Sequence, residues 1–242
     1  MASLKSKQSQ IAEIVKCGKD PVYFMNKYLK IQHPMRGLIP FKTYPFQDDC
    51  VIEFNNHRFS IVLKSRQLGL STLVAAYATW QAVFYKDKNI LIIATKLAVA
   101  QNFIRKVKTY IKSMPKWLLV PIITANNKQQ IEFSNGSQIK AVPTSEDAGR
   151  SEALSLLIVD EAAFVRNFDD LWMGLYPTLS TGGRAILLST PNGVGGQYHE
   201  IYTKAERKEN KFNPIKLLWD VHPERGEEWF EKEVKNMSKK QV

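Results

Sequence analysis

The chain has 242 residues, which suits one large α/β domain with a small appendage, and its 44% hydrophobic content is too high for a disordered chain. No apolar run reaches the roughly 20 residues that span a bilayer, and residues 1–10 lack an apolar signal segment, so we expect neither a membrane nor a secreted protein. Lysine and arginine number 34 against 23 acidic residues, and this net charge of +11 favours a polyanionic partner.

The N-terminal part of the chain predicts short helices separated by breaks. Residues 1–20 are polar and lysine-rich, and we expect a frayed or weakly helical arm. Apolar residues at helical spacing predict helices over 21–30 and 45–55. Pro34, Gly37 and Pro40 break the chain between them. Two cysteines, Cys17 and Cys50, lack the partners of a disulfide scaffold or a zinc site, so we expect a reducing, intracellular location.

From residue 58 onward, strands and helices alternate. The predicted strands are 59–63, 89–94, 130–133, 138–142, 154–159 and 185–188, and the predicted helices are 71–85 and 97–114. Asn135-Gly136 predicts a hairpin between the third and fourth of these strands. Short apolar runs that alternate with helices indicate an α/β fold with a mainly parallel sheet covered on both faces.

The first predicted strand runs into a loop with the context of a phosphate-binding loop, between a strand and a helix. It reads Lys64-Ser65-Arg66-Gln67-Leu68-Gly69-Leu70-Ser71-Thr72. Backbone N–H groups would point at the anion, and Ser71 stands where a hydroxyl usually binds Mg²⁺. Leu70 holds the usual lysine position, so the positive charge has to come from Lys64 or Arg66. The alternative is a capped helix with solvated cations.

A pair of carboxylates follows the apolar strand at 154–159. Asp160 and Glu161 have the pattern of a Walker B strand, in which Asp160 would hold Mg²⁺ and Glu161 would polarise the attacking water. Ligands of open α/β sheets bind at the carboxyl ends of strands, which favours a site over an exposed loop. The next strand runs into Ser189-Thr190-Pro191-Asn192-Gly193, a polar turn that we expect beside the γ-phosphate.

Together, the loop 64–72, the LLIVDEAAF run (156–164) and the STPNG turn (189–193) resemble the ATPase domain of tailed-bacteriophage large terminase subunits, over about residues 40–220. The resemblance implies a P-loop NTPase of the ASCE, RecA-like type. It makes 64–72 Walker A, 160–164 an extended Walker B and 189–193 the coupling motif. Some members move the Walker A lysine to the front of the loop, as Lys64 is here, whereas others keep it at the position of Leu70.

The resemblance also implies roles for two further residues. Gln47, in the segment Tyr44-Pro45-Phe46-Gln47, matches the glutamine that recognises adenine. Arg150 matches an arginine that reaches the γ-phosphate of a neighbouring subunit in a ring. A finger of this kind contributes about 10³–10⁵ in rate. Arg66 is the alternative, as a finger within the same subunit.

The implied function is ATP hydrolysis that translocates double-stranded DNA into a procapsid, in the cytoplasm of the infected bacterial host. The implied cofactors are ATP and Mg²⁺, and the implied partners are DNA, the portal protein, the small terminase subunit and further copies in a ring, with a monomer in solution alone. We expect lysines and arginines in the ring channel to grip the DNA backbone, with Lys96, Arg105, Lys106 and Lys108 as candidates.

The resemblance divides the chain into an arm with the adenine-recognising helical segment (1–57), an ATPase core (58–200) and C-terminal lid or linker helices (201–242). It implies no nuclease domain in this chain. Two alternatives remain. A superfamily-2-like helicase fragment would share the loop and the acidic pair. A degenerate nucleotide-binding module that only binds DNA or the portal would explain Leu70, although it has no need of Glu161.

Overall fold

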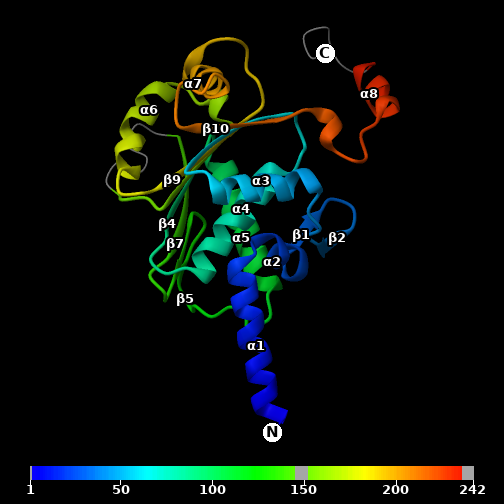
Figure 1. The fold of residues 1–242 in the computed structure, drawn as a ribbon, viewed down its shortest axis with the longest axis vertical. Coiled ribbons are helices and arrows are strands. Elements are labelled where there is room, and N and C mark those ends of the chain that lie inside the picture. The colour runs from blue at the N-terminus through cyan, green and yellow to red at the C-terminus, as the bar shows by residue number, and fades with distance from the viewer. Residues whose placement is uncertain (1, 145–151, 236–242) are drawn as a thin grey trace.

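The computed structural model describes residues 2–144 and 152–235. Its centre is an eight-stranded sheet in the order β10-β3-β9-β8-β4-β7-β6-β5 (Figure 1). Its strands are β3 (Phe59–Lys64), β4 (Asn89–Ala94), β5 (Ile123–Asn126), β6 (Gln130–Phe133), β7 (Gln138–Pro143), β8 (Leu156–Asp160), β9 (Arg184–Ser189) and β10 (Phe212–Leu217). Every pairing from β10 to β7 is parallel, and β6 and β5 are added antiparallel. The predicted α/β class, with a mainly parallel sheet, is confirmed.

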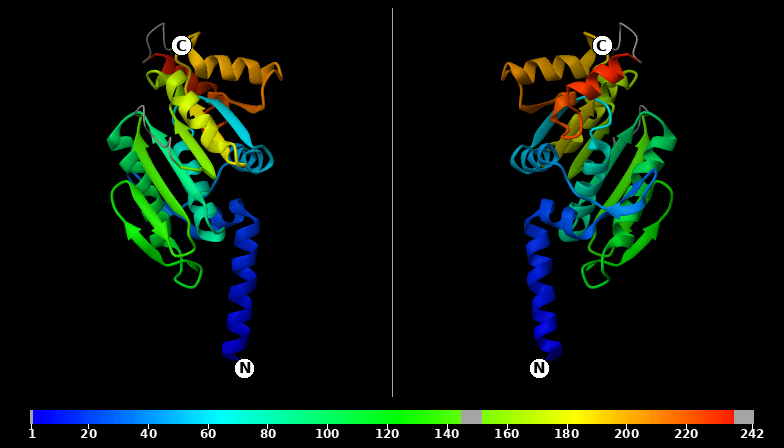
Figure 2. Two further views of the ribbon diagram at one scale, coloured as in Figure 1. Left: turned by 90° about the vertical axis from the view of Figure 1, so that its left-hand side faces the viewer. Right: turned by 90° about the vertical axis from the view of Figure 1, so that its right-hand side faces the viewer.

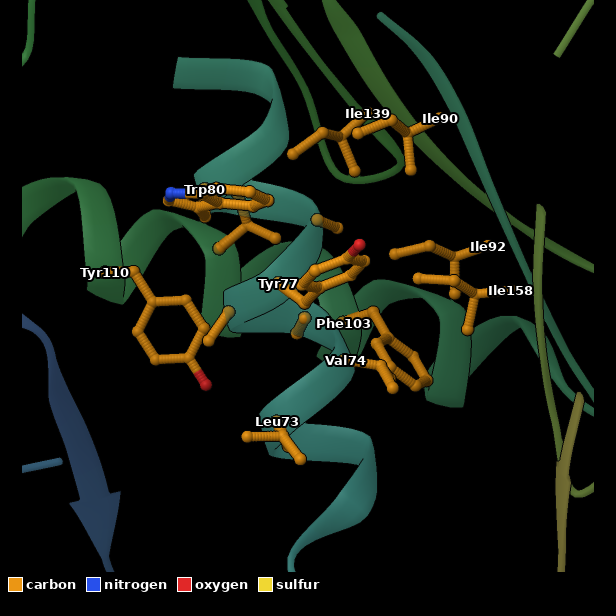
Figure 3. Packing of buried hydrophobic residues seen from close by; sticks show 14 of the residues in the cluster. Leu73, Val74, Tyr77, Trp80, Ile90, Ile92, Phe103, Tyr110, Ile139 and Ile158 are labelled. Carbon is orange, nitrogen blue, oxygen red and sulfur yellow. The ribbon is translucent and has the colours of Figure 1, made fainter. Parts of the chain in front are cut away.

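Helices cover both faces of the sheet because side chains alternate between faces along each strand. Ile92 and Ile158 face the cluster formed with α4 (Leu70–Phe84) and α5 (Leu97–Ser113), and Figure 3 shows side chains of these strands and of both helices packed together, with Tyr77 of α4 and Phe103 of α5 among them. Ile93 and Val159 face the opposite cluster, formed with α6 (Phe168–Leu175) and α7 (Gly196–Glu206). Burial on two sides explains why these strands read as unbroken apolar runs.

The N-terminal arm is a regular helix rather than a frayed segment. It comprises α1 (Ala2–Lys19), which projects from the body at the end away from α7 (Figures 1 and 2). Its C-terminal part is held by packing: Trp80 Nε1 donates to Cys17 O at 2.9 Å, and Glu13 Oε1 accepts a bond from Lys27 Nζ at 2.7 Å. Cys17 and Cys50 are both buried free thiols.

Several elements escaped the sequence analysis. A small hairpin, β1 (Lys30–His33) and β2 (Gly37–Pro40), occupies the segment that the prolines and glycine were expected only to break. It links α2 (Pro21–Tyr28) to α3 (Pro45–Asn56). The segment expected to form lid or linker helices contributes β10, which pairs with β3 as an edge strand of the sheet, whereas α8 (Glu227–Val234) is a helix as expected. Within the described residues, no helix combines the length and apolarity needed to cross a membrane.

Candidate nucleotide-binding site

The sheet order brings the three sequence motifs together. Because β9 lies between β3 and β8, the ends of these three parallel strands lie side by side. The loop 64–72 leaves β3, the acidic pair ends β8, and the turn 189–193 leaves β9. Motifs that lie far apart in the chain thus meet at one edge of the sheet, where open α/β folds bind ligands.

The Walker A lysine candidate contacts the second carboxylate of Walker B. Lys64 Nζ lies 2.8 Å from Glu161 Oε1, and the Lys64 side chain is only 7% exposed. Arg66, the other candidate, is an exposed residue of the same cavity. The structure therefore places Lys64 at the centre of the site and Arg66 at its rim.

The first carboxylate of Walker B meets the loop hydroxyl. Ser71 Oγ donates to Asp160 Oδ2 at 2.8 Å, and Asp160 is 4% exposed. Burial raises the pKa of Asp160, while the hydrogen bond from Ser71 and the charge of Lys64 act in the opposite direction. Hydroxyl and carboxylate oxygens side by side are the protein ligands that Mg²⁺ takes when phosphates and waters supply the rest.

Glu161 is held in a strained backbone conformation. Its φ is +53°, in the left-handed region that non-glycine residues seldom adopt, and such strain gathers at functional sites. Its Oε2 accepts bonds from both Thr190 N at 3.2 Å and Thr190 Oγ1 at 3.1 Å. Burial would raise the pKa of Glu161, but the hydrogen bond and charge of Lys64, with the bonds from Thr190, hold it below its ordinary value. Glu161 is thus an ionised carboxylate whose orientation is fixed by its bonds to Lys64 and Thr190.

The coupling turn contacts Walker B through further bonds. Ser189 Oγ accepts a bond from Ala163 N at 3.1 Å, and Asn192 Nδ2 donates to Ala163 O at 2.8 Å. Pro191 and Gly193 are exposed. Two hydrogen bonds therefore join the residues after β8 to the turn after β9.

A cavity of about 920 Å³ opens over these residues, large enough for a nucleotide. The described residues that line it include five basic side chains, Lys64, Arg66, Lys96, Lys106 and Arg166, and one acidic side chain, Glu161. A surplus of cations on this scale suits a polyphosphate. The loop residues from Arg66 to Thr72 also line the cavity. Ser65 is not among the lining residues, and its N–H donates to Leu217 O at 2.9 Å.

Part of the cavity wall was not predicted as nucleotide-binding. No sequence motif singles out three of the lining residues, which follow strands or helical turns: Thr95, Thr144 and Arg166. Lys96 and Lys106 were predicted to grip DNA, but both line this cavity. Lys108 instead donates from Nζ to Asn127 O at 2.9 Å. Residue type alone cannot separate a lysine that faces DNA from one that faces a nucleotide.

Gln47 lies behind the loop, in contact with its backbone. It is 3% exposed, its Nε2 donates to Leu68 O at 2.9 Å, and its Oε1 accepts from Tyr44 N at 3.2 Å. Gly69 closes this contact: its φ is +73°, and a Cβ there would lie 2.8 Å from Gln47 Nε2. Recognition of adenine by Gln47 stays a prediction, and the structure shows in addition that Gln47 positions the loop.

Two further arginines, Arg225 and Arg150, lie outside the three sequence motifs. Arg225 contacts the loop from the C-terminal segment, through Nη1 to Arg66 O at 3.0 Å and Nη2 to Gln67 O at 3.1 Å. No sequence signal marked this residue. Arg150, predicted as the finger that acts on a neighbouring subunit, lies outside the described residues.

Comparison with known proteins agrees with this geometry. Residues 61–240 match the family model described as "Terminase large subunit, T4likevirus-type, N-terminal". The large terminase ATPase domain of Thermus phage P74-26 superposes with a TM-score of 0.69 at 19% identity, over 83% of this chain and 91% of that one.

Two further structures show how far the fold likeness extends. The large terminase of bacteriophage HK97 superposes with a TM-score of 0.68 at 16% identity, over 86% of this chain and 45% of that one. The present chain thus spans somewhat less than half the length of that terminase. The UvsW helicase of bacteriophage T4 is more distant, with a TM-score of 0.52 at 16% identity over 82% of this chain and 67% of that one.

The family match covers most of the chain and includes all three motifs that meet at the sheet edge. The chain therefore belongs to the large terminase subunit family, and it matches the N-terminal domain of that subunit.

Proposed function

We propose that this domain binds ATP with Mg²⁺ in the 920 Å³ cavity and hydrolyses it. The observation that carries the proposal is the pair of 2.8 Å contacts between the loop and Walker B, Lys64 Nζ to Glu161 Oε1 and Ser71 Oγ to Asp160 Oδ2. Two independent links between the same two segments gather a phosphate-binding group, a metal-binding pair and a water-orienting carboxylate around one space.

The oxygen donors fit Mg²⁺. Ser71 and Asp160 would hold the ion, and no group of three or more histidine, cysteine, aspartate or glutamate side chains able to bind a metal exists in the described part of the chain. One carboxylate and one hydroxyl suit an ion that keeps most of its ligands as water and phosphate. When bound, Mg²⁺ supplies charge neutralisation to the β- and γ-phosphates.

The chain's own residues have separable roles in this reaction. The N–H groups of the loop and the ammonium of Lys64 bind the phosphates, with Arg66 at the rim. Glu161 accepts a hydrogen bond from the attacking water and directs its lone pair at the γ-phosphate. Lys64 is paired with Glu161, so a bound phosphate would compete for Lys64 and release one carboxylate oxygen toward water.

Hydrolysis would be transmitted to the rest of the motor through Thr190 and Asn192, because both contact the segment that carries Glu161. We propose that this movement drives double-stranded DNA into a procapsid. The proposed partners are the portal protein, the small terminase subunit and further copies of this chain in a ring. The net charge of +11 supports contact with the DNA backbone without reading of sequence.

The test is Mg²⁺-dependent ATP turnover of the chain across a range of protein concentrations, with Glu161→Gln as the inactive variant and the exposed Glu228→Gln as its matched control. We expect turnover that Glu161→Gln lowers by about 10²–10⁴-fold while nucleotide binding remains. Nucleotide binding without turnover at any concentration would favour the binding-only module. Stimulation by single-stranded rather than double-stranded DNA would favour the helicase.

The concentration series also tests the ring. If Arg150 completes a neighbour's site, turnover per chain rises with concentration, and Arg150→Ala abolishes that rise. If turnover per chain is constant and Arg150→Ala has no effect, Arg66 becomes the favoured arginine.

A further inference from the structure

The usual lysine position of the loop does not supply a charge in this chain. Leu70 stands there, 2% exposed, as part of the hydrophobic cluster under α4. Lys64 supplies one cation but is paired with Glu161. A second cation that faces the same space is therefore of interest, and α5 provides it.

Lys106 lies on the stripe of α5 that faces the start of α4. One turn before it, Phe103 is 1% exposed, and one turn after it, the Tyr110 hydroxyl donates to Thr72 O at 3.0 Å. Residues three and four apart share one face of a helix, so Lys106 lies on the same face of α5 as Phe103 and Tyr110. Figure 3 shows Phe103 and Tyr110 on α5 beside α4.

Within the described part of the protein, no anionic side chain forms an ion pair with the Lys106 ammonium. Lys106 lines the nucleotide cavity and also the neighbouring cavity that contains Asp160. Both Asp160 oxygens already accept bonds, Oδ2 from Ser71 Oγ at 2.8 Å and Oδ1 from Glu161 N at 3.1 Å. Among the described residues, none forms a hydrogen bond or ion pair with Lys106, whose Nζ lies 5.3 Å from the ring centroid of Phe103. Its three N–H donors are thus available to a ligand.

We infer that Lys106 is a second phosphate-binding lysine of this site, which binds the polyphosphate from α5 and replaces the charge that Leu70 lacks. A cation that lines a cavity is costly to desolvate unless an anion offsets it, and a nucleotide polyphosphate brings that anion. Lys64 and Lys106 would then hold the phosphates from opposite sides, one from β3 and one from α5. This inference rests on the proposed nucleotide binding.

The alternative is that Lys106 only neutralises Asp160 until Mg²⁺ arrives. The two roles differ when no metal is present. A phosphate-binding lysine contributes to nucleotide affinity with or without Mg²⁺, whereas a substitute cation repels Mg²⁺ and does not contribute to nucleotide affinity in EDTA.

The experiment measures the affinity of the full chain for ADP, ATP-gamma-S and inorganic triphosphate by titration calorimetry, in Mg²⁺ and in EDTA. Lys106→Met keeps the length of the side chain and removes its charge, Lys106→Gln is a second neutral variant, and Lys106→Arg keeps the charge. Lys112→Met, on the exposed end of the same helix, is the matched control. Thermal melts verify that each variant is folded.

We expect Lys106→Met and Lys106→Gln to raise the Kd of all three ligands about ten- to a hundredfold in both buffers. Lys106→Arg should retain most of the affinity, and Lys112→Met should match the wild type. Unchanged affinity in the neutral variants overturns the inference, as does tighter ligand binding in Mg²⁺ without any loss of affinity in EDTA. If the wild type itself binds no nucleotide, it is the proposed function that fails.

Discussion

Lys64 Nζ and Glu161 Oε1 lie 2.8 Å apart, so the lysine proposed to bind phosphate is paired with the carboxylate proposed to orient water. Glu161 is held from its other oxygen by Thr190. The orientation of the Glu161 carboxylate therefore depends on both Lys64 and Thr190. We expect a bound phosphate to draw Lys64 away, so that the hydrogen bonds of Thr190 then determine where Glu161 points.

Lys64→Met removes this ion pair and a phosphate-binding charge. We expect kcat to fall by about 10²–10³-fold, the usual cost of one positioned charge in an active site, and the Kd for ATP-gamma-S to rise about tenfold. Steady-state kinetics and calorimetry measure the two effects. Lys128→Met, in an exposed loop, is the control for loss of one positive charge. Full activity in Lys64→Met would transfer the role to Arg66.

Asp160→Asn should stabilise the metal-free protein. Burial holds the pKa of Asp160 above its ordinary value, so the folded protein binds this proton more tightly than the unfolded chain does. Stability is then lost as pH rises from the unfolded pKa through the folded pKa, and at neutral pH the charged carboxylate carries that cost. In EDTA we expect Asp160→Asn to raise Tm by a few degrees, about 1 kcal/mol. In Mg²⁺ we expect the same variant to lose turnover.

The control for that melt is Asp170→Asn, since Asp170 is exposed at the start of α6. A lower Tm for Asp160→Asn would mean that the bonds from Ser71 and from the backbone outweigh the cost of burial.

For Glu161 the pH dependence of stability has the opposite sign. Its pKa is lowered, so its contribution to stability is present above the unfolded pKa and is lost as pH falls through the folded value.

Thr190→Val removes one of the two bonds that Thr190 donates to Glu161 Oε2 and keeps the shape of the side chain. The backbone N–H of Thr190 still donates at 3.2 Å, so we expect a partial effect. Turnover should fall about tenfold, the equivalent of one hydrogen bond, and the Kd for nucleotide should change less than about twofold. Thr181→Val, in the exposed turn before β9, is the control. An equal loss in affinity and turnover would place Thr190 in binding rather than in orientation.

Arg225→Met should detach the C-terminal segment from the loop. Arg225 donates to the backbone of Arg66 and Gln67, and its guanidinium lies 4.7 Å from the ring centroid of Trp229. We expect faster hydrogen exchange in residues 218–234 and in the loop, and a Tm lower by a few degrees, about 1 kcal/mol. Arg207→Met, exposed at the end of α7, should leave both unchanged. Unaltered exchange in Arg225→Met would show that the segment is held by other contacts.

The core of the fold could be read from local patterns. Each apolar run between 59 and 188 became a strand of the sheet, because both of its faces are buried, and the Asn135-Gly136 turn joins β6 and β7 as expected. The arm was misjudged because its sequence is polar: α1 is stabilised at its C-terminal part by contacts of Cys17 and Glu13 with residues far along the chain. β10 was missed because Pro214 interrupts its pattern, which an edge strand tolerates.

The linear order of residues determined that Lys64, Ser71, Asp160 and Glu161 each end a strand or begin a helix, since these motifs combine a buried run with a polar terminus. Only the tertiary structure decided which partners they meet. The pairing of Lys64 with Glu161, the position of Lys106 in the cavity and the contact of Arg225 with the loop all depend on how distant elements pack. Local periodicity records which face of an element is buried, but not which other element buries it.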